Sequence, residues 1–231
     1  MTTLSRIPLD PRVRGARKLI GNPQAMHAAV MTAFSAGEAD LSGRVLWRLD
    51  STPDRHVLYL VGPGVPDLDV IAGQACSAGE RGDTADLGPF LDRLATGQRW
   101  AFRLTANPVH SKAGERGQRG RVLAHVTVAQ QLAWLDTKSG QHGFSIVHRD
   151  APREPSAEEL AVEHLDAMVS QRRDLRFHKG KAKHPVMIRT ARFDGHLEVT
   201  DAELLRRSLT EGIGRARAYG CGLLSLAAPT G

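Results

Sequence analysis

The stretch NPQAMHAAVMTAFSAG, residues 22–37, sets the fold of the first half of the chain. It predicts a helix, because Asn22 is a favourable N-cap and Pro23 suits the first helical position. Gly37 ends the pattern. The apolar stripe that this helix would bury is formed by Met26, Val30, Ala33 and Phe34. His27 directly follows Met26 and therefore lies on the flank of the stripe.

Segments with strand-like patterns lie on both sides of this helix. The pattern of apolar residues predicts strands at residues 4–9, 44–49, 56–61 and 99–105 and helices at 68–75 and 87–95. The basic residues at 12–18 indicate a loop. The order strand, helix, strand, strand, helix, strand is that of the ferredoxin-like split βαβ unit. We therefore expect an α+β domain of this type over residues 1–105.

The second half repeats this mixture of elements. Residues 106–121 are rich in Gly, Arg and Lys and predict a mobile basic loop between two domains. Beyond them the pattern predicts helices at 128–138 and 201–211, a helix start at 156–159, strands at 143–148, 196–199 and 223–227, and a hairpin over 175–192 with its turn near Gly180. Residues 167–170 fit a helix end or a strand equally well. A second α+β unit over residues 122–231 is expected, although the halves share no sequence repeat.

The positive charge of the chain is concentrated in two segments. The 231 residues carry a formal charge of +6 and a pI near 9.8. Basic residues far outnumber acidic ones at 103–121 and 172–192, which favours a polyanionic partner. Aromatic residues make up only 5%. An RNA-binding chain of this composition is expected to read backbone and helical shape rather than to stack unpaired bases.

The sequence contains no membrane, secretion or metal-binding signal. No apolar run reaches the roughly 18 residues of a membrane span, and the basic N-terminus lacks the apolar core of a secretory signal. We therefore expect a cytoplasmic protein with no membrane partner. Cys76 and Cys221 are far apart, so neither a disulfide nor a zinc site is expected. No metalloenzyme or hydrolase motif occurs, and nothing points to a metal or a cofactor.

His27 is the candidate for chemistry. It lies in the first or second turn of the predicted helix, where backbone N–H groups favour an anion and disfavour an imidazolium. A neutral imidazole beside a phosphate is what removal of a proton from a ribose 2′-OH requires. The alternative is a half-exposed helix histidine without a role.

Three segments offer candidate RNA contacts. The first basic segment contributes Arg103 and Lys112. The hairpin contributes Arg176, Lys179, Lys181, Lys183 and Arg189. The alternative interpretation of the hairpin is a solvated tip without a binding role. The tail GIGRARAYGCGLLSLAAP (212–229) offers backbone N–H groups and two cations, and its candidates are Gly212, Gly214, Arg215, Arg217, Gly220 and Gly222. A helix C-cap followed by a turn explains the first glycines of the tail equally well.

The same tail resembles the closing glycine-rich loop and strand of the CasE family, the repeat-processing endoribonucleases of type I-E CRISPR systems. NPQAMH (22–27), FRLTANPVHS (102–111) and FDGHLEV (193–199) resemble family segments in the same order, and LAWL (132–135) is a weaker match. Each segment is weak alone. The ordered set spans residues 22–229 and is specific.

The resemblance implies two ferredoxin-like domains in tandem and cleavage of precursor CRISPR RNA at the 3′ base of the repeat stem-loop. The 2′-OH upstream of the scissile phosphate would attack it without a metal, leaving a 2′,3′-cyclic phosphate and a 5′-OH. His27 matches the catalytic histidine of the family, and the basic hairpin matches the element that enters the major groove of the RNA stem. The product would stay bound, and the chain would be a subunit of the Cascade surveillance complex.

One position departs from the family pattern. Some members carry a tyrosine three residues before the histidine, where this chain has Gln24. A cation such as Arg17, Lys18 or Lys112 is then a candidate to stabilise the charged transition state.

Two other interpretations of the function remain open. One is a non-catalytic RNA-binding subunit of such a complex, which is expected to lack the histidine; the other is a basic α+β domain that binds nucleic acid without structural preference.

Overall fold

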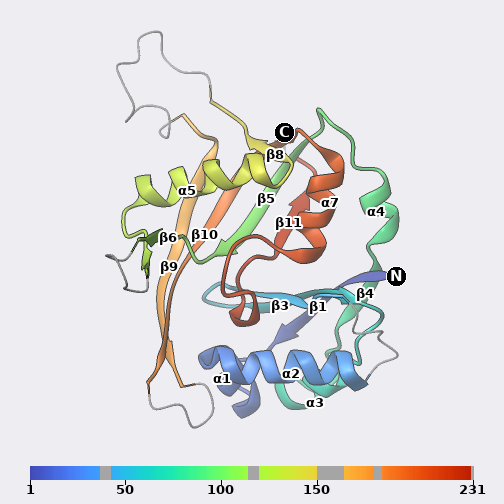
Figure 1. Ribbon diagram of the computed structural model, residues 1–231. Helices are drawn as coiled ribbons and strands as arrows, with labels where there is room; N and C mark the ends of the chain where they lie inside the picture. The colour runs from blue at the N-terminus through green and yellow to red at the C-terminus, as the bar shows by residue number, and fades with distance from the viewer. Residues whose placement is uncertain (37–42, 114–119, 150–163, 179–183, 230–231) are drawn as a thin grey trace.

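The computed structural model describes residues 1–36, 43–113, 120–149, 164–178 and 184–229, and it contains two units in which helices cover one face of an antiparallel sheet (Figure 1). The helix start predicted at 156–159 and the turn predicted near Gly180 lie outside these ranges. Within them, no helix is both long enough and apolar enough to span a bilayer.

The first unit contains β1 (Thr2–Leu9), α1 (Arg14–Gly21), α2 (Pro23–Ala36), β2 (Leu46–Ser51), β3 (His56–Pro63), α3 (Asp69–Ala75) and β4 (Asp83–Asp86). Its strands pair antiparallel in the order β2-β3-β1-β4, which is the ferredoxin-like arrangement. The three helices lie on one face of this sheet (Figure 1). The predicted stripe of α2 is confirmed, because its four side chains are fully buried in the core of the unit: Met26, Val30, Ala33 and Phe34.

The connecting helix α4 (Gly88–Asp92) leads into the second unit. This unit contains β5 (Arg99–Ala106), α5 (Val128–Gln141), β8 (Phe144–Ile146), β9 (Ala167–Phe177), β10 (Val186–Val199), α7 (Ala202–Glu211), the 3-10 turn η1 (Arg217–Tyr219) and β11 (Leu224–Ala227). The antiparallel order β11-β5-β10-β8 repeats the ferredoxin-like arrangement, and β9 pairs with β10 as a long hairpin. The expected α+β fold with two tandem ferredoxin-like units is confirmed.

Two predictions made for residues 1–105 are wrong, and strand pairing and burial explain why. The strand predicted at 99–105 does not close the first sheet, because β5 pairs with β10 and β11. The short strand β4 pairs with β1 instead, and its polar sequence DTAD has no alternating pattern to reveal it. The change of sheet therefore falls between Asp86 and Arg99. The basic segment at 12–18 is not a loop, since α1 begins at Arg14 and buries Ala16 and Leu19.

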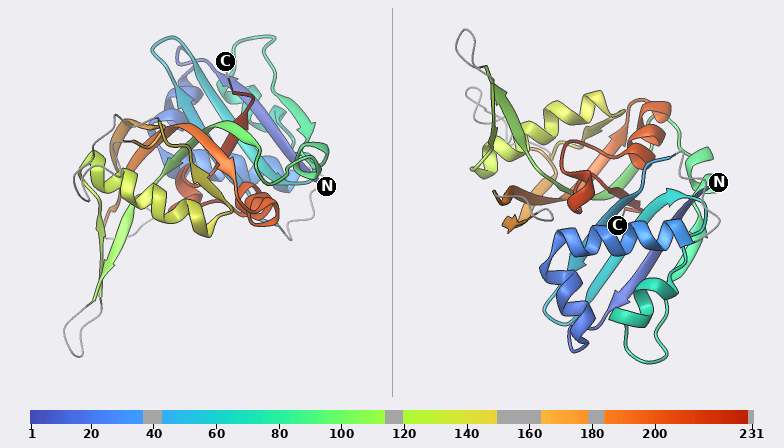
Figure 2. Two further views of the ribbon diagram at one scale, coloured as in Figure 1. Left: turned by 90° about the horizontal axis from the view of Figure 1, so that it is seen from above. Right: turned by 60° about the horizontal axis from the view of Figure 1, so that its bottom comes forward.

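The segment 106–121, predicted as a loop, is partly strand. β6 (Val109–Lys112) pairs with β7 (Arg121–Ala124) in a two-stranded ribbon that projects from the second unit (Figure 2). Cross-strand partners share a face, so the register gathers on one side His110, Lys112, Arg121 and Leu123. Most side chains of the ribbon are exposed, and this polar composition is why the segment resembles a loop in sequence.

One buried arginine and a small apolar cluster join the two units. Leu46 and Val61 of the first sheet pack on Leu223, next to β11. The Arg48 side chain is 3% exposed and forms an ion pair with Asp50 at 2.7 Å. Its Nη1 donates to the carbonyls of Arg103 and Leu223, both at 3.1 Å. Because these two carbonyls belong to the second unit, a single guanidinium spans the junction.

Candidate nucleic-acid interface

The start of α2 has its backbone donors already occupied. The side-chain oxygen of Asn22 accepts from the N–H groups of Gln24 and Ala25, at 2.9 and 3.2 Å. The N–H of Met26 donates to the Asn22 carbonyl at 3.0 Å, and Pro23 has no N–H. The predicted N-cap is therefore confirmed. An anion at this helix start would depend on the dipole and on side-chain cations, not on free backbone N–H groups.

Three aromatic rings from separate elements meet at the junction. The half-buried imidazole of His27 on α2 and the ring of Tyr219 in η1 have centroids 6.3 Å apart and an interplanar angle of 63°. The rings of Tyr219 and Phe177, the last residue of β9, have centroids 4.7 Å apart at 58°. We call His27, Tyr219 and Phe177 the ring triad. It connects a helix of the first unit to the hairpin of the second.

A cleft with a cavity volume of about 70 Å³ opens between the units beside the ring triad. Its polar lining includes Gln171, Arg173, Arg192 and Tyr219. His27 is not part of the lining, but its ring lies beside that of Tyr219, which is. Arg192 is ion-paired with Asp194 at 2.8 Å. Arg173 is exposed, and no carboxylate in the described ranges forms an ion pair with it.

The predicted hairpin forms from β9 and β10 and extends past the end of α1 (Figure 1). Its register pairs Arg189 with Asp174, and their side chains form an ion pair at 2.6 Å. Arg176 faces Met187 in the register and is exposed, without a carboxylate partner among the residues that the structure describes. The predicted contacts Lys179, Lys181 and Lys183 lie outside the described residues. Arg176 is thus freer than Arg189 to meet a phosphate.

The glycine-rich tail forms a tight, packed turn. Gly212 is the C-cap of α7 with φ 81°, as one of the two interpretations of the sequence predicted. Gly212, Gly220 and Gly222 are buried, and a Cβ on Gly220 would lie 2.7 Å from the Trp47 ring. These three glycines therefore shape the turn that carries Tyr219, and their burial argues against the direct RNA contact expected of them.

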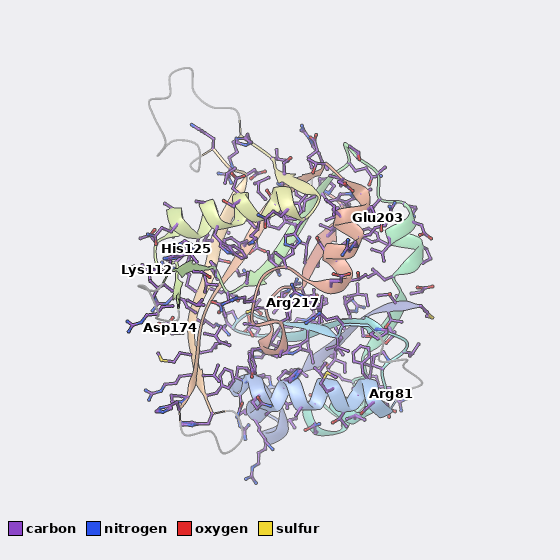
Figure 3. The ribbon with its side chains drawn as sticks, viewed as in Figure 1. Arg81, Lys112, His125, Asp174, Glu203 and Arg217 are labelled. Carbon is purple, nitrogen blue, oxygen red and sulfur yellow. The ribbon has the colours of Figure 1, made fainter. Side chains whose placement is uncertain are left out.

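The two arginines of the tail differ in their surroundings. Arg215 is exposed, next to the half-buried Gly214. The Nε of Arg217 donates to the Gly214 carbonyl at 3.0 Å, and the residue lies between the two units in Figure 3. Burial and the nearby charge of Arg44 lower the pKa of Arg217. Arg215 is therefore the better placed of the two to meet an external anion.

Arg103 and Lys112, both predicted to contact RNA, have different environments. Arg103 forms ion pairs with Asp50, at 3.1 Å, and with Asp194, so two carboxylates already balance its charge. Burial disfavours the charged guanidinium, but these bonds outweigh it and raise the pKa of Arg103. Its surroundings favour a structural role at the junction. Lys112 is exposed on the β6–β7 ribbon, on the side of the molecule where Figure 3 labels His125.

The remaining candidate cations are not all available. Arg17 donates through Nη1 to the carbonyls of Pro11 and Arg12, at 3.0 and 2.7 Å, which ties it to the chain before α1. Lys18 is exposed on α1. Gln24 is half-buried in α2, and the aromatic ring beside the histidine comes instead from Tyr219.

Metal ligands are sparse in the described part of the chain, where no three His, Cys, Asp or Glu side chains gather closely enough to hold an ion. Cys76 and Cys221 are free thiols, and burial raises the pKa of Cys221 to about 12.

Sequence reasoning did not single out Arg173 or Tyr219. Arg173 is one arginine in a basic run, and only the strand register places it on the cleft face. Tyr219 stands in the glycine-rich tail, 192 positions after His27, and no sequence pattern connects the two.

The fold and the site define a class of protein: tandem ferredoxin-like units whose junction combines a histidine, a cationic cleft and a basic hairpin, an arrangement suited to a polyanion. The family model described as CRISPR associated protein matches residues 3–228. Together with the curated relatives described next, this match shows that the chain belongs to the CasE family of CRISPR-associated proteins.

Relatives with known roles cover most of the chain. It is 31% identical to the CRISPR-associated endoribonuclease Cse3 of Thermus thermophilus over 229 residues, which are 97% of this chain and 99% of the relative. It is 32% identical to the Cascade subunit CasE of Escherichia coli over 142 residues, 58% and 61% of the two chains. The solved structure of Thermus thermophilus Cse3 bound to an RNA representing a pre-cleavage complex has a TM-score of 0.72 at 27% identity and covers 98% of both chains.

Proposed function

We propose that this chain is a metal-independent endoribonuclease that cuts precursor CRISPR RNA at the 3′ base of the repeat stem-loop and keeps the product as a Cascade subunit in the cytoplasm. One observation carries the proposal: His27 lies beside a cationic cleft at the junction of the two units. The match to an endoribonuclease along 97% of the chain supports it.

In the proposed reaction, the ribose 2′-OH attacks the adjacent phosphate and the 5′ oxygen of the next nucleotide leaves. The products are a 2′,3′-cyclic phosphate and a 5′-OH. His27 transfers the proton, either from the attacking hydroxyl or to the leaving oxygen. Negative charge develops on the phosphoryl oxygens in the transition state, where a nearby cation is most effective. Arg173 is our candidate, because it lines the cleft and no described carboxylate neutralises it.

We assign binding of the RNA stem to the hairpin, and this binding is separate from the cleavage step. Arg176 and the lysines of the turn, Lys179, Lys181 and Lys183, would neutralise phosphates along the groove, each adding salt-sensitive affinity. Arg215 and Lys112 would extend this surface. Because these contacts do not involve His27, cleavage leaves them intact and the product stays bound.

The test is single-turnover cleavage of a labelled repeat RNA by an excess of protein. His27→Ala is expected to abolish the cut while the affinity for the stem-loop stays within a few fold. His148→Ala is the matched control, since His148 is exposed and lies on the second unit. Full activity in EDTA is expected, and loss on chelation would indicate a metal enzyme. A rate unchanged by His27→Ala would remove His27 from the mechanism, and equal affinity for a scrambled RNA would leave only a non-specific binder.

A further inference from the structure

We propose that Tyr219 is a positioning residue that holds the imidazole of His27 at the cleft and links it to the hairpin through Phe177. This inference rests on the proposed function and goes beyond it, because it explains how a histidine on the first unit keeps its orientation relative to an RNA gripped by the second. The argument begins with the turn that carries Tyr219.

The backbone of η1 is fixed on both sides of Tyr219. Ala216 and Gly220, which flank the turn, adopt left-handed conformations with φ 61° and φ 80°. The N–H of Tyr219 donates to the Ala216 carbonyl at 2.9 Å. Trp47 of the first sheet donates through Nε1 to the Ala218 carbonyl at 3.3 Å. The turn is therefore fastened to the first unit, and the Tyr219 ring leaves it in a defined direction.

The ring of Tyr219 then restricts the imidazole. An angle of 63° at a centroid distance of 6.3 Å is an edge-to-face arrangement, which aromatic rings prefer over face-to-face stacking. Such a contact limits rotation of the His27 ring about its Cβ–Cγ bond. Proton transfer requires the nitrogen within hydrogen-bonding distance of the reacting oxygen, so a freely rotating imidazole would spend less time in a productive orientation.

Phe177 couples the contact between Tyr219 and His27 to the position of the hairpin. It is the last residue of β9, 7% exposed, and pairs with Val186 of β10 in the register. Lys179, the first of the hairpin lysines predicted to contact RNA, follows two positions later in the sequence. A hairpin seated on an RNA stem therefore determines where Phe177 lies, and Tyr219 relays that position to the imidazole of His27.

The experiment uses the full chain and labelled repeat RNA at saturating protein, with Tyr219→Phe, Tyr219→Leu and Tyr219→Ala. Tyr59→Phe is the control, because the sequence has 2 tyrosines and Tyr59 is the other one. Melting curves check that each variant is folded. The His27 Cε1–H resonance, assigned with His27→Ala, reports the ring packing directly, since a neighbouring aromatic ring shifts it.

Loss of the ring in Tyr219→Leu is expected to slow cleavage about 30-fold, with stem-loop affinity within about threefold, because misplacing a catalytic group costs rate rather than binding. Tyr219→Phe restores the ring and should recover the rate to within about threefold. The His27 resonance should move in Tyr219→Leu and not in Tyr59→Phe. A Tyr219→Leu rate within twofold of the parent, or a Tyr219→Phe as slow as Tyr219→Leu, overturns the inference.

The two proposals fail in distinguishable ways. If His27→Ala cuts normally, the role of His27 in cleavage is wrong, whatever Tyr219 does. If His27→Ala is inactive but the His27 resonance ignores the loss of the Tyr219 ring, the cleavage proposal stands and the positioning role is wrong.

Discussion

Replacing Arg48 with methionine is expected to lower the free energy of unfolding by about 4 kcal/mol, because this side chain connects the two units. Its side chain is 3% exposed, and it donates to both oxygens of Asp50, at 2.7 and 3.1 Å. Removing one partner of a buried ion pair costs about 3–5 kcal/mol. Asp50 keeps Arg103 as a partner, which reduces the loss, but the carbonyls of Arg103 and Leu223 lose a donor, at about 1 kcal/mol each.

The assay is urea unfolding followed by tryptophan fluorescence. Arg149→Met is the matched control: Arg149 pairs with Asp166 at 3.0 Å but is 62% exposed, so its loss should cost less than about 1 kcal/mol. A loss below about 1 kcal/mol for Arg48→Met would refute the view that this guanidinium carries the junction.

The same ion pair gives the stability a defined pH dependence. Burial opposes ionisation of Asp50, but Arg48 and Arg103 outweigh it and hold the pKa of Asp50 below its usual value. The contribution of the carboxylate is therefore complete above the unfolded pKa of about 3.9 and is lost as the pH falls through the lower folded pKa. The difference between the parent and Arg48→Met should persist at neutral pH and shrink only in acid below about pH 4.

Two further pairs of variants test the hairpin and the tail. Arg176→Ala should lower the slope of log affinity against log salt by about 1, and Arg189→Ala by less, since Asp174 already balances Arg189; equal slopes would argue against this distinction. Gly220→Ala should lower the free energy of unfolding by about 2–4 kcal/mol, because φ is 80° and the new Cβ would lie 2.7 Å from the Trp47 ring. Gly140→Ala, with open space around it, should not lower the free energy of unfolding in the same urea titration.

Much of the fold was predictable because the signals were local. The stripe from Met26 to Phe34 has helical period, and the cap at Asn22 and the stop after α7 at Gly212 follow from the chemistry of single residues. Strand order was less accessible. β4 is four polar-rich residues that form a strand only because β1 offers an open edge. β5 has a clear strand pattern, but the pattern does not say which sheet it joins.

The candidate site was likewise predictable only in part. The helix start and the family resemblance singled out His27 as the candidate for catalysis, and composition singled out the basic hairpin. The charge balance of each cation was not predictable, because it depends on which carboxylates lie opposite. Arg103 pairs with two carboxylates at the junction, while no carboxylate among the described residues pairs with Arg176.

The amino-acid sequence alone determined the element types, the basic character of the hairpin and the presence of an imidazole at a helix start, since each depends on neighbours a few positions away. The tertiary structure alone decided that Tyr219 meets His27, that Arg173 faces the cleft and that Arg48 spans the units. These contacts join residues far apart in the chain, and their geometry is set by how two sheets pack together.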